Sequence, residues 1–119
     1  MKAPRANTYR DTWCGAVLAD RVGQTVRVAG WVHRRRDHGG LIFIDLRDRT
    51  GLLQLVFHPE HAPQAHEAAH ALRAEDVISA RGRIVRREER NLNPNMPTGE
   101  IELSVAELDV LDTIEKRLR

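Results

Sequence analysis

The chain has 119 residues, of which 41% are hydrophobic and 30% charged, and its formal net charge of +2 excludes a histone-like polycation. Its length suits one domain with its own core, and its composition is that of a globular protein rather than a disordered or collagen-like chain. A lone cysteine, no apolar run near the roughly 18 residues of a membrane span and no signal-peptide pattern indicate a cytoplasmic protein without membrane contact.

Three strands are predicted in the first half of the chain, after an irregular lead-in over residues 1–24. Residues 25–36 form the first strand, and Gly30 within it indicates a bulge or a sharp bend. Residues 41–48 and 51–57 form the next two, each preceded by a turn signal that contains glycine.

The polarity of the second and third strands alternates, which predicts how they face one another. With Arg49 and Thr50 at the tip, every buried candidate meets another buried candidate. The predicted pairs are Asp48 with Gly51, Leu46 with Leu53, Ile44 with Leu55 and Ile42 with Phe57. Phe43 and Gln54 then lie side by side on the outer surface. A phenylalanine there either packs beneath another segment, such as the N-terminal one, or offers its ring to a ligand.

Arginines gather beside this outer surface. One cluster ends the first strand and another follows in the second half of the chain: Arg34, Arg35 and Arg36, then Arg81, Arg83, Arg86 and Arg87. Basic clusters are usually solvated faces, so charge alone identifies no ligand. Together with an outward aromatic ring, however, they favour a ligand with phosphates and flat bases, such as single-stranded nucleic acid.

The second half of the chain completes a recognisable order of elements. It predicts a helix over 62–75, a strand over 77–87, a polar loop over 91–99 and a strand over 100–111. In the fourth strand the inward residues are Ile78, Ala80, Gly82 and Ile84, and the fifth strand changes phase near Ala106. Strands and helix in the order β-β-β-α-β-β predict an all-β, five-stranded Greek-key barrel, the OB-fold. Ligands of this fold usually bind on strands two and three, between the loops that follow strands one and four.

One motif suggests a different function. His66-Glu67-Ala68-Ala69-His70 matches the H-E-x-x-H pattern of zinc hydrolases, in which two histidines one helical turn apart hold zinc. A catalytic zinc needs a third protein ligand and a substrate cleft, and a barrel of this size has little room for a cleft. We therefore interpret this segment as a solvent-facing helix and expect no metal site.

Three blocks of sequence resemble a known family. Trp31 to Asp37, Leu41 to Arg49 and Gly51 to Phe57 closely resemble the N-terminal anticodon-binding domain of bacterial aspartyl-tRNA synthetases, as does the segment Thr98 to Glu102. The likeness runs from about Tyr9 to Leu111. We therefore expect one OB-fold anticodon-binding domain over residues 1–111, and a linker or an added tail over 112–119.

The resemblance implies a set of RNA-binding residues for an anticodon that reads G-U-C. Phe43 corresponds to the ring on which the middle base stacks and Gln54 to the amide that binds it, and Glu102 lies near the first base. The other residues are Asn91 and Asn93, near the third base, and Arg36 and Arg34, on bases or phosphates. Such chemistry is typical of proteins that read unstacked RNA bases. Arg35 has the opposite parity and is the weakest candidate.

His38 departs from the pattern of many members of the family, which have leucine at its position. Histidine followed by glycine resembles the enzymes that also accept asparagine tRNA, whose anticodon G-U-U differs only at the third base. His38 is therefore a specificity candidate, and relaxed recognition of both anticodons is a hypothesis.

No motif of the family's class II catalytic domain is found in this sequence. ATP and Mg²⁺ serve that domain in the parent enzyme, a homodimer, so we expect this chain to need no cofactor, to be a monomer and to bind tRNA without catalysis. The alternative is a free-standing OB-fold that binds single-stranded nucleic acid without sequence preference. Such binders usually spread several aromatic rings along a groove, whereas this chain has five aromatic residues.

Overall fold

The structure is a computed structural model that describes residue 7 and residues 9–118. Its strands are β1 (Thr25–His38), β2 (Leu41–Asp48), β3 (Gly51–Phe57), β4 (Val77–Arg86) and β5 (Ile101–Asp112). Its helices are α1 (Pro63–Ala69) and α2 (Ile114–Arg117), with short 3-10 helices η1 (Cys14–Ala16), η2 (Ala19–Arg21) and η3 (Glu89–Asn91). No helix of the described part is long and apolar enough to cross a membrane.

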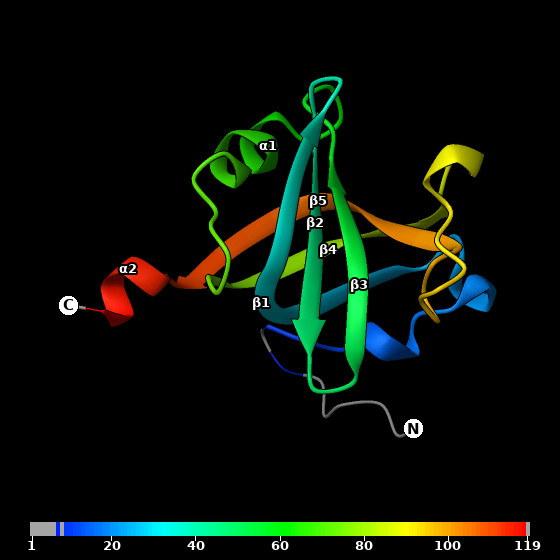
Figure 1. The fold of residues 1–119 in the computed structure, drawn as a ribbon, viewed down its shortest axis with the longest axis horizontal. Helices are drawn as coiled ribbons and strands as arrows, with labels where there is room; N and C mark the ends of the chain where they lie inside the picture. The colour runs from blue at the N-terminus through cyan, green and yellow to red at the C-terminus, as the bar shows by residue number, and fades with distance from the viewer. Residues whose placement is uncertain (1–6, 8, 119) are drawn as a thin grey trace.

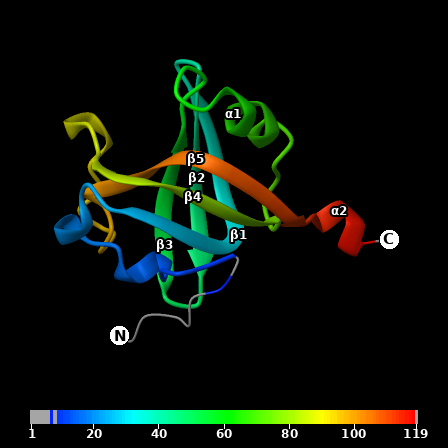
Figure 2. The same cartoon turned by 180° about the vertical axis from the view of Figure 1, so that it is seen from behind.

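The five strands close into a barrel in the order β1-β2-β3-β5-β4. In Figure 1 the strands β2 and β3 stand upright in front, and β4 and β5 cross behind them. Figure 2 shows the same crossing from the other side. The barrel closes through a short parallel contact of β3 with β5, at Leu55 with Leu103 and Val56 with Ser104. The predicted all-β barrel is confirmed.

Strand β1 bends so that it belongs to both halves of the barrel. Its first half pairs with β4 and its second half with β2, and Trp31 pairs with both. A Cβ on Gly30 would lie 2.2 Å from the carbonyl oxygen of Arg47, so only glycine allows this close approach. Of the predicted bulge or sharp bend at Gly30, the bulge is not found there, because the register of β1 against β2 shifts at His33. The bend agrees with the structure, since β1 changes partner from β4 to β2 at Trp31.

The predicted register of the β2–β3 hairpin is confirmed pair by pair, from Ile42 with Phe57 to Asp48 with Gly51. The inward residues of β4 are buried as predicted, and the phase change of β5 is a bulge at Ala106. Helix α1 is shorter than the predicted 62–75, and it packs on β5, β2 and β3 through its buried Ala65 and Ala69.

The segments around Cys14, before β1, and Ile114, after β5, are also anchored to the barrel. The Asp48 carboxylate accepts hydrogen bonds from the backbone N–H of Cys14 at 2.7 Å and from that of Thr50 at 2.8 Å. At the other end the backbone N–H of Ile114 donates to the Asp76 carboxylate at 2.8 Å. Helix α2 lies at the C-terminal end of β5, far from η3 (Figure 1).

Candidate nucleic-acid interface

Two adjoining cavities lie where strands β1, β2 and β3 meet the segment that follows β4. The first, here the histidine cavity, has a volume of about 280 Å³ and contains His38 and His58. The second, the arginine cavity, has about 310 Å³ and contains Arg34 and Arg36. Asn91 lines both, so the two cavities form one continuous interface.

The structure brings all eight of the residues singled out from the sequence to this interface. The histidine cavity is lined by His38, Phe43, Asn91 and Glu102, and the arginine cavity by Arg34, Arg36, Gln54, Asn91 and Asn93. His38 thus shares a cavity with Glu102, while Asn93 lies in the neighbouring one. Their coming together results from the fold, because they belong to four strands (β1, β2, β3 and β5), to η3 and to the loop that follows it.

The ring of Phe43 is covered, not open to solvent. Its exposed fraction is 5%, and the Arg36 guanidinium lies over the ring, 5.2 Å from its centroid. The predicted outer side of the barrel is correct for Phe43, which lies outside the core and lines the histidine cavity, but the ring is not exposed. Its cover is an arginine of β1 rather than the N-terminal segment. Such an arginine on an aromatic face is a cation–π contact, and a planar base uses the same face.

Gln54 is the hydrogen-bonding centre of the interface, although only 1% of it is exposed. Its Oε1 accepts from Arg36 Nη2 at 3.0 Å and from Arg87 Nη1 at 3.2 Å. Its Nε2 donates to Glu102 Oε1 at 2.8 Å. The amide is therefore fixed in one orientation, with its oxygen toward the arginines and its nitrogen toward the carboxylate. The prediction that it lies on the outer surface is corrected: it lies on the outer side of the barrel, but buried.

Arg87 is a buried residue of the interface that the sequence analysis assigned only to a basic cluster. Its Nε donates to the carbonyl of Ile101 at 2.8 Å and its Nη1 to that of Asn91 at 3.1 Å. Its buried Nη2 has no hydrogen-bond partner among the described residues. Burial lowers the pKa of the Arg87 guanidinium, against the charges of Glu102 and Asp45.

Glu102 carries the only carboxylate among the eight predicted residues. Burial raises the pKa of the Glu102 carboxyl, while the Gln54 hydrogen bond and the charge of Arg87 act to lower it. An ionised carboxylate here accepts hydrogen bonds, and the amino and imino groups of guanine could donate them. The protonation state of Glu102 therefore decides whether this carboxyl only accepts hydrogen bonds or also donates one.

The loop after β4 is ordered by its own polar groups. The Asn93 side chain accepts from the backbone N–H of Asn95 at 3.0 Å, and the backbone N–H of Asn93 donates to the carbonyl of Gly99. The Thr98 hydroxyl donates to the carbonyl of Leu52 in β3 at 2.6 Å. These contacts hold the loop against the hairpin that carries Gln54.

The H-E-x-x-H segment forms the end of α1. Among the described residues no group of three or more histidine, cysteine, aspartate or glutamate side chains could hold a metal ion. The His66 ring instead lies 2.8 Å from the carbonyl oxygen of Gly40, through its Nε2.

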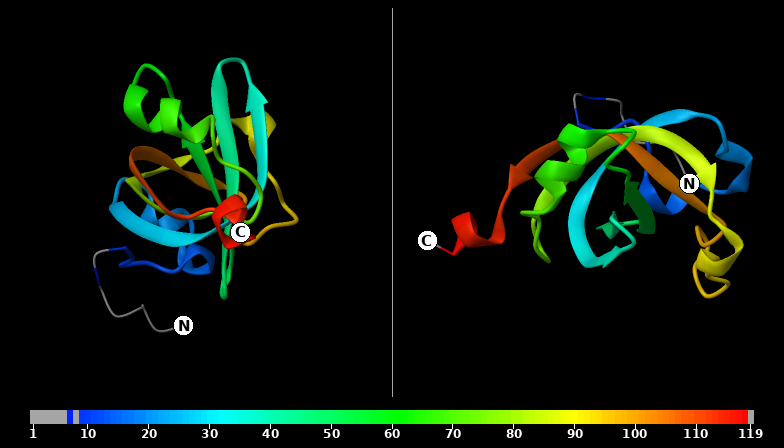
Figure 3. Two further views of the ribbon diagram at one scale, coloured as in Figure 1. Left: turned by 90° about the vertical axis from the view of Figure 1, so that its left-hand side faces the viewer. Right: turned by 90° about the horizontal axis from the view of Figure 1, so that it is seen from above.

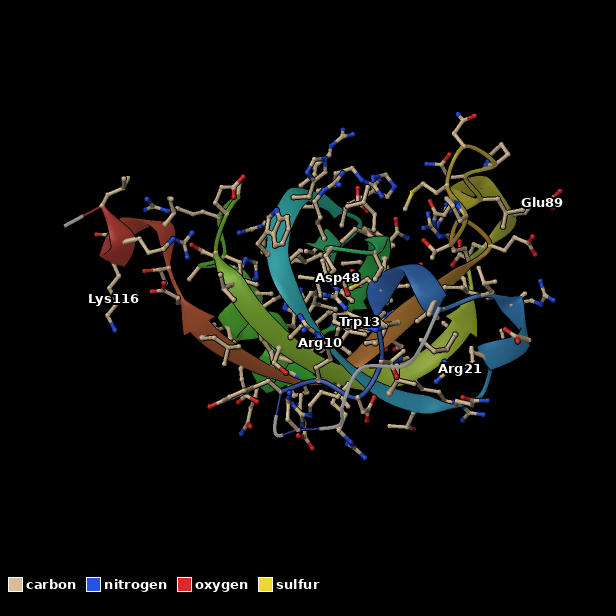
Figure 4. The ribbon with its side chains drawn as sticks, turned by 90° about the horizontal axis from the view of Figure 1, so that it is seen from below. Arg10, Trp13, Arg21, Asp48, Glu89 and Lys116 are labelled. Carbon is tan, nitrogen blue, oxygen red and sulfur yellow. The ribbon has the colours of Figure 1, made fainter. Side chains whose placement is uncertain are left out.

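A larger hollow, of about 510 Å³, lies at the tip of the β2–β3 hairpin and contains none of the predicted residues. The guanidinium groups of Arg10 and Arg49 both lie over the Trp13 ring, at 4.7 Å and 4.5 Å from its centroid. Figure 4 shows Arg10, Trp13 and Asp48 close together there, and Glu89 of η3 well apart from them. These contacts anchor the N-terminal lead-in to the hairpin.

The family model described as an OB-fold nucleic acid binding domain matches residues 26–111. An aspartate–tRNA(Asp/Asn) ligase of Protochlamydia amoebophila is 56% identical over 102 residues, which are 86% of this chain and 17% of the ligase. A ligase of the same name from Rubrobacter xylanophilus is 52% identical over 97% of this chain and 19% of its own length. The chain thus spans less than a fifth of these relatives.

Solved structures agree on the fold. The asparaginyl-tRNA synthetase of Pyrococcus horikoshii in complex with asparaginyl-adenylate superposes with a TM-score of 0.76 and 28% identity, over 91% of this chain and 23% of that one. A protein titled OBody AM2EP06, bound to hen egg-white lysozyme, superposes with a TM-score of 0.77 at 21% identity, over 92% of this chain and 99% of that one. The second likeness concerns the fold alone.

Proposed function

Because the chain belongs to the family of OB-fold nucleic acid binding domains, in the form that aspartate–tRNA ligases carry, we propose that it binds the anticodon loop of tRNA that reads G-U-C and also the loop that reads G-U-U. One observation carries this proposal. The predicted RNA-binding residues line two joined cavities, and Gln54 links the arginines of one to the carboxylate of the other.

Binding of the middle base requires an exchange on Phe43. The Arg36 guanidinium leaves the ring and a base stacks there, which is worth about 1–3 kcal/mol for a stacked base. The departure of Arg36 frees one acceptor site on Gln54 Oε1, which the N3–H of uracil can fill. The second N–H of Gln54 Nε2 can donate to a uracil carbonyl. Arg36 and the exposed Arg34 then bind phosphate oxygens.

The neighbouring bases are bound at either side of this centre. The Glu102 carboxylate accepts hydrogen bonds from guanine, and Asn91 and Asn93 offer amide groups to the third base. His38 stands at the rim of the histidine cavity and is our candidate for tolerance at the third position. The names of the two bacterial relatives include both aspartate and asparagine tRNA, which supports relaxed recognition.

We place this binding within a longer ligase, whose ATP- and Mg²⁺-dependent chemistry belongs to a catalytic domain outside this sequence. For the 119 residues themselves we expect RNA binding without aminoacylation.

The test is a titration of the chain against anticodon stem-loops that read G-U-C, G-U-U and an unrelated triplet, at two salt concentrations. We expect both cognate loops to bind better than the unrelated loop, and we expect Phe43→Leu to abolish this preference. Leucine keeps the site apolar but removes the stacking face. Tyr9→Ala is the matched control, because Tyr9 is an exposed aromatic residue that lines the hollow at the hairpin tip.

Equal binding of all three loops, with a steep dependence on salt, would overturn the proposal. The basic residues would then act alone, as in a binder without sequence preference.

A further inference from the structure

His38 is the last residue of β1 and pairs with Leu41 of β2 across the two-residue turn of Gly39 and Gly40. Gly39 and Gly40 both have positive φ angles, +60° and +82°, and a Cβ on either would meet nothing within 4 Å. Two adjacent glycines with few neighbours give a backbone many accessible conformations. A contact from outside the hairpin can therefore restrict the turn next to His38.

Helix α1 supplies a first support through His66. The Nε2 atom of His66 lies 2.8 Å from the carbonyl oxygen of Gly40, so a proton on Nε2 makes this contact a hydrogen bond. Figures 1 and 3 agree that α1 lies beside the end of the β1–β2 turn. The helix is itself fixed, because Ala65 and Ala69 are buried in the core.

A second support joins the strand before the turn to the end of the same helix. Arg35 Nη1 donates to the carbonyl oxygens of His70 at 2.6 Å and Leu72 at 3.2 Å. Its Nε and Nη2 donate to the two carboxylate oxygens of Asp37, both at 2.9 Å. A cation beside the last carbonyls of a helix is also electrostatically favourable.

The four-residue spacing of the two histidines in the H-E-x-x-H segment places their side chains next to each other on the helix. The rings of His66 and His70 meet edge to face, with their centroids 4.8 Å apart and their planes at 89°. In this arrangement the Nε2 atom of His66 lies toward the turn, near the carbonyl oxygen of Gly40.

We propose that His66 is a positioning residue for third-base recognition: it holds the turn at Gly40 and thereby places His38 at the rim of the histidine cavity. The inference rests on the proposed function, since it assigns a support to its specificity residue. It goes beyond that function because His66 lies outside both cavities and binds no RNA itself.

The experiment compares His66→Ala with His66→Gln, whose amide N–H can replace Nε2–H at the Gly40 carbonyl. Glu67→Ala is the matched control, as an exposed neighbour on the same helix. Each variant is titrated with loops that read G-U-C, G-U-A and G-A-C, so that the third-base and the middle-base preferences are measured separately. Amide hydrogen exchange of Gly39 and Gly40 is followed in the free protein.

For His66→Ala we expect faster exchange at the two glycines and a third-base preference at least threefold smaller, with the middle-base preference unchanged. His66→Gln and Glu67→Ala keep both preferences within about twofold, the small end of what one hydrogen bond contributes. In a His38→Ala background, His66→Ala has no further effect on the third-base preference, because the two residues act in series.

An unchanged third-base preference in His66→Ala, with a selective wild type, would overturn the positioning role even if the turn exchanges faster. Parallel loss of both preferences would also overturn it, since that indicates general loosening of the fold. A wild type that binds all three loops equally would instead refute the proposed function.

Discussion

Gln54 combines two tasks in one buried side chain. Its oxygen accepts from Arg36 and Arg87, and its nitrogen donates to Glu102, so three charged groups depend on one neutral amide. Hydrogen bonds to charged groups are stronger than neutral ones, and their loss leaves buried charge without a partner. The same contacts that stabilise the free interface therefore orient the amide for a base.

Gln54→Leu is expected to reduce the free energy of unfolding by about 2–3 kcal/mol, because it leaves two guanidinium groups and a carboxylate without their common partner. Urea denaturation followed by circular dichroism measures this change. Gln64→Leu, on the exposed side of α1, serves as the control and should change stability by less than about 0.5 kcal/mol. A stable Gln54→Leu variant would show that the network contributes nothing to folding.

RNA binding is expected to weaken in acid because of Glu102. Burial raises the pKa of this carboxyl in the folded protein, so protonation begins at a higher pH than for an ordinary glutamate. Affinity for the G-U-C loop should be constant well above that raised pKa and should fall as the pH decreases through it. Titrations from about pH 8 to about pH 4.5 measure this, with the ordinary value near 4.3 as reference. Glu102→Gln should bind more weakly at neutral pH and lose this dependence.

The sequence predicts which residues form the interface better than it predicts how their side chains are arranged. The resemblance of the strand blocks identified eight residues, and parity placed Phe43 and Gln54 together. Neither signal reveals that Arg36 lies over Phe43, because that depends on the conformation of a long side chain. Arg87 has the parity of the exposed Arg81 and Arg83, but β4 ends at Arg86 and the chain turns there.

Among the elements, the β2–β3 hairpin and the lead-in depend on one buried carboxylate. Asp48 binds the backbone of Cys14 and of Thr50, and the Thr50 hydroxyl as well. Burial acts to raise the pKa of Asp48, but these hydrogen bonds outweigh it, and the pKa lies below its usual value. A carboxyl with a lowered pKa stabilises the fold in its ionised form.

Asp48→Asn is expected to reduce the free energy of unfolding by about 1–2 kcal/mol at neutral pH. The ionised carboxylate stabilises the fold fully above the pKa of unfolded aspartate, about 3.9. This contribution is lost as the pH falls through the lower folded pKa, so the difference between wild type and variant should shrink in acid. Urea midpoints at about pH 7 and about pH 3 test the sign, with Asp20→Asn as an exposed control. A difference that grows in acid would contradict this account.

The elements were predictable where two signals agreed. The hairpin register was correct because alternation and turn residues specify the same pairing. Helix α1 was predicted too long, because the alanine-rich spacing continues past Ala69. The chain nevertheless leaves the helix there and turns toward β4. Glu75, in this connection, has a positive φ of 74°. Gly30 was predicted to mark a bulge or a sharp bend; it lies next to the bend of β1, where a close backbone contact requires glycine, and the bulge lies at His33.

Over the whole molecule, basic and acidic residues nearly balance, so an excess of positive charge occurs only at particular places on the surface. The chain has 19 basic and 17 acidic residues, and many arginines pair with acids on the barrel surface, as Arg81 does with Glu107. The interface instead contains Arg34, which is exposed. We therefore expect an electrostatic contribution from a few residues rather than from the net charge.

Arg34→Gln is expected to weaken all anticodon loops alike and to reduce the slope of log K against log salt by about 0.7, the value for one phosphate contact on a single strand. Arg81→Gln removes the same charge from β4 and should leave the slope unchanged. Fluorescence anisotropy with a labelled stem-loop, at several salt concentrations, measures both. A similar change of slope for both variants would mean that only total charge matters.

The covered ring of Phe43 has a thermodynamic consequence. A base that stacks on an open aromatic ring removes apolar surface from water, and such burial gives a negative heat-capacity change. Here the Arg36 guanidinium already excludes water from that face, so a base replaces an arginine rather than a hydration shell. The enthalpy of loop binding should consequently vary little with temperature, and Arg36→Ala, which uncovers the ring, should make it vary more.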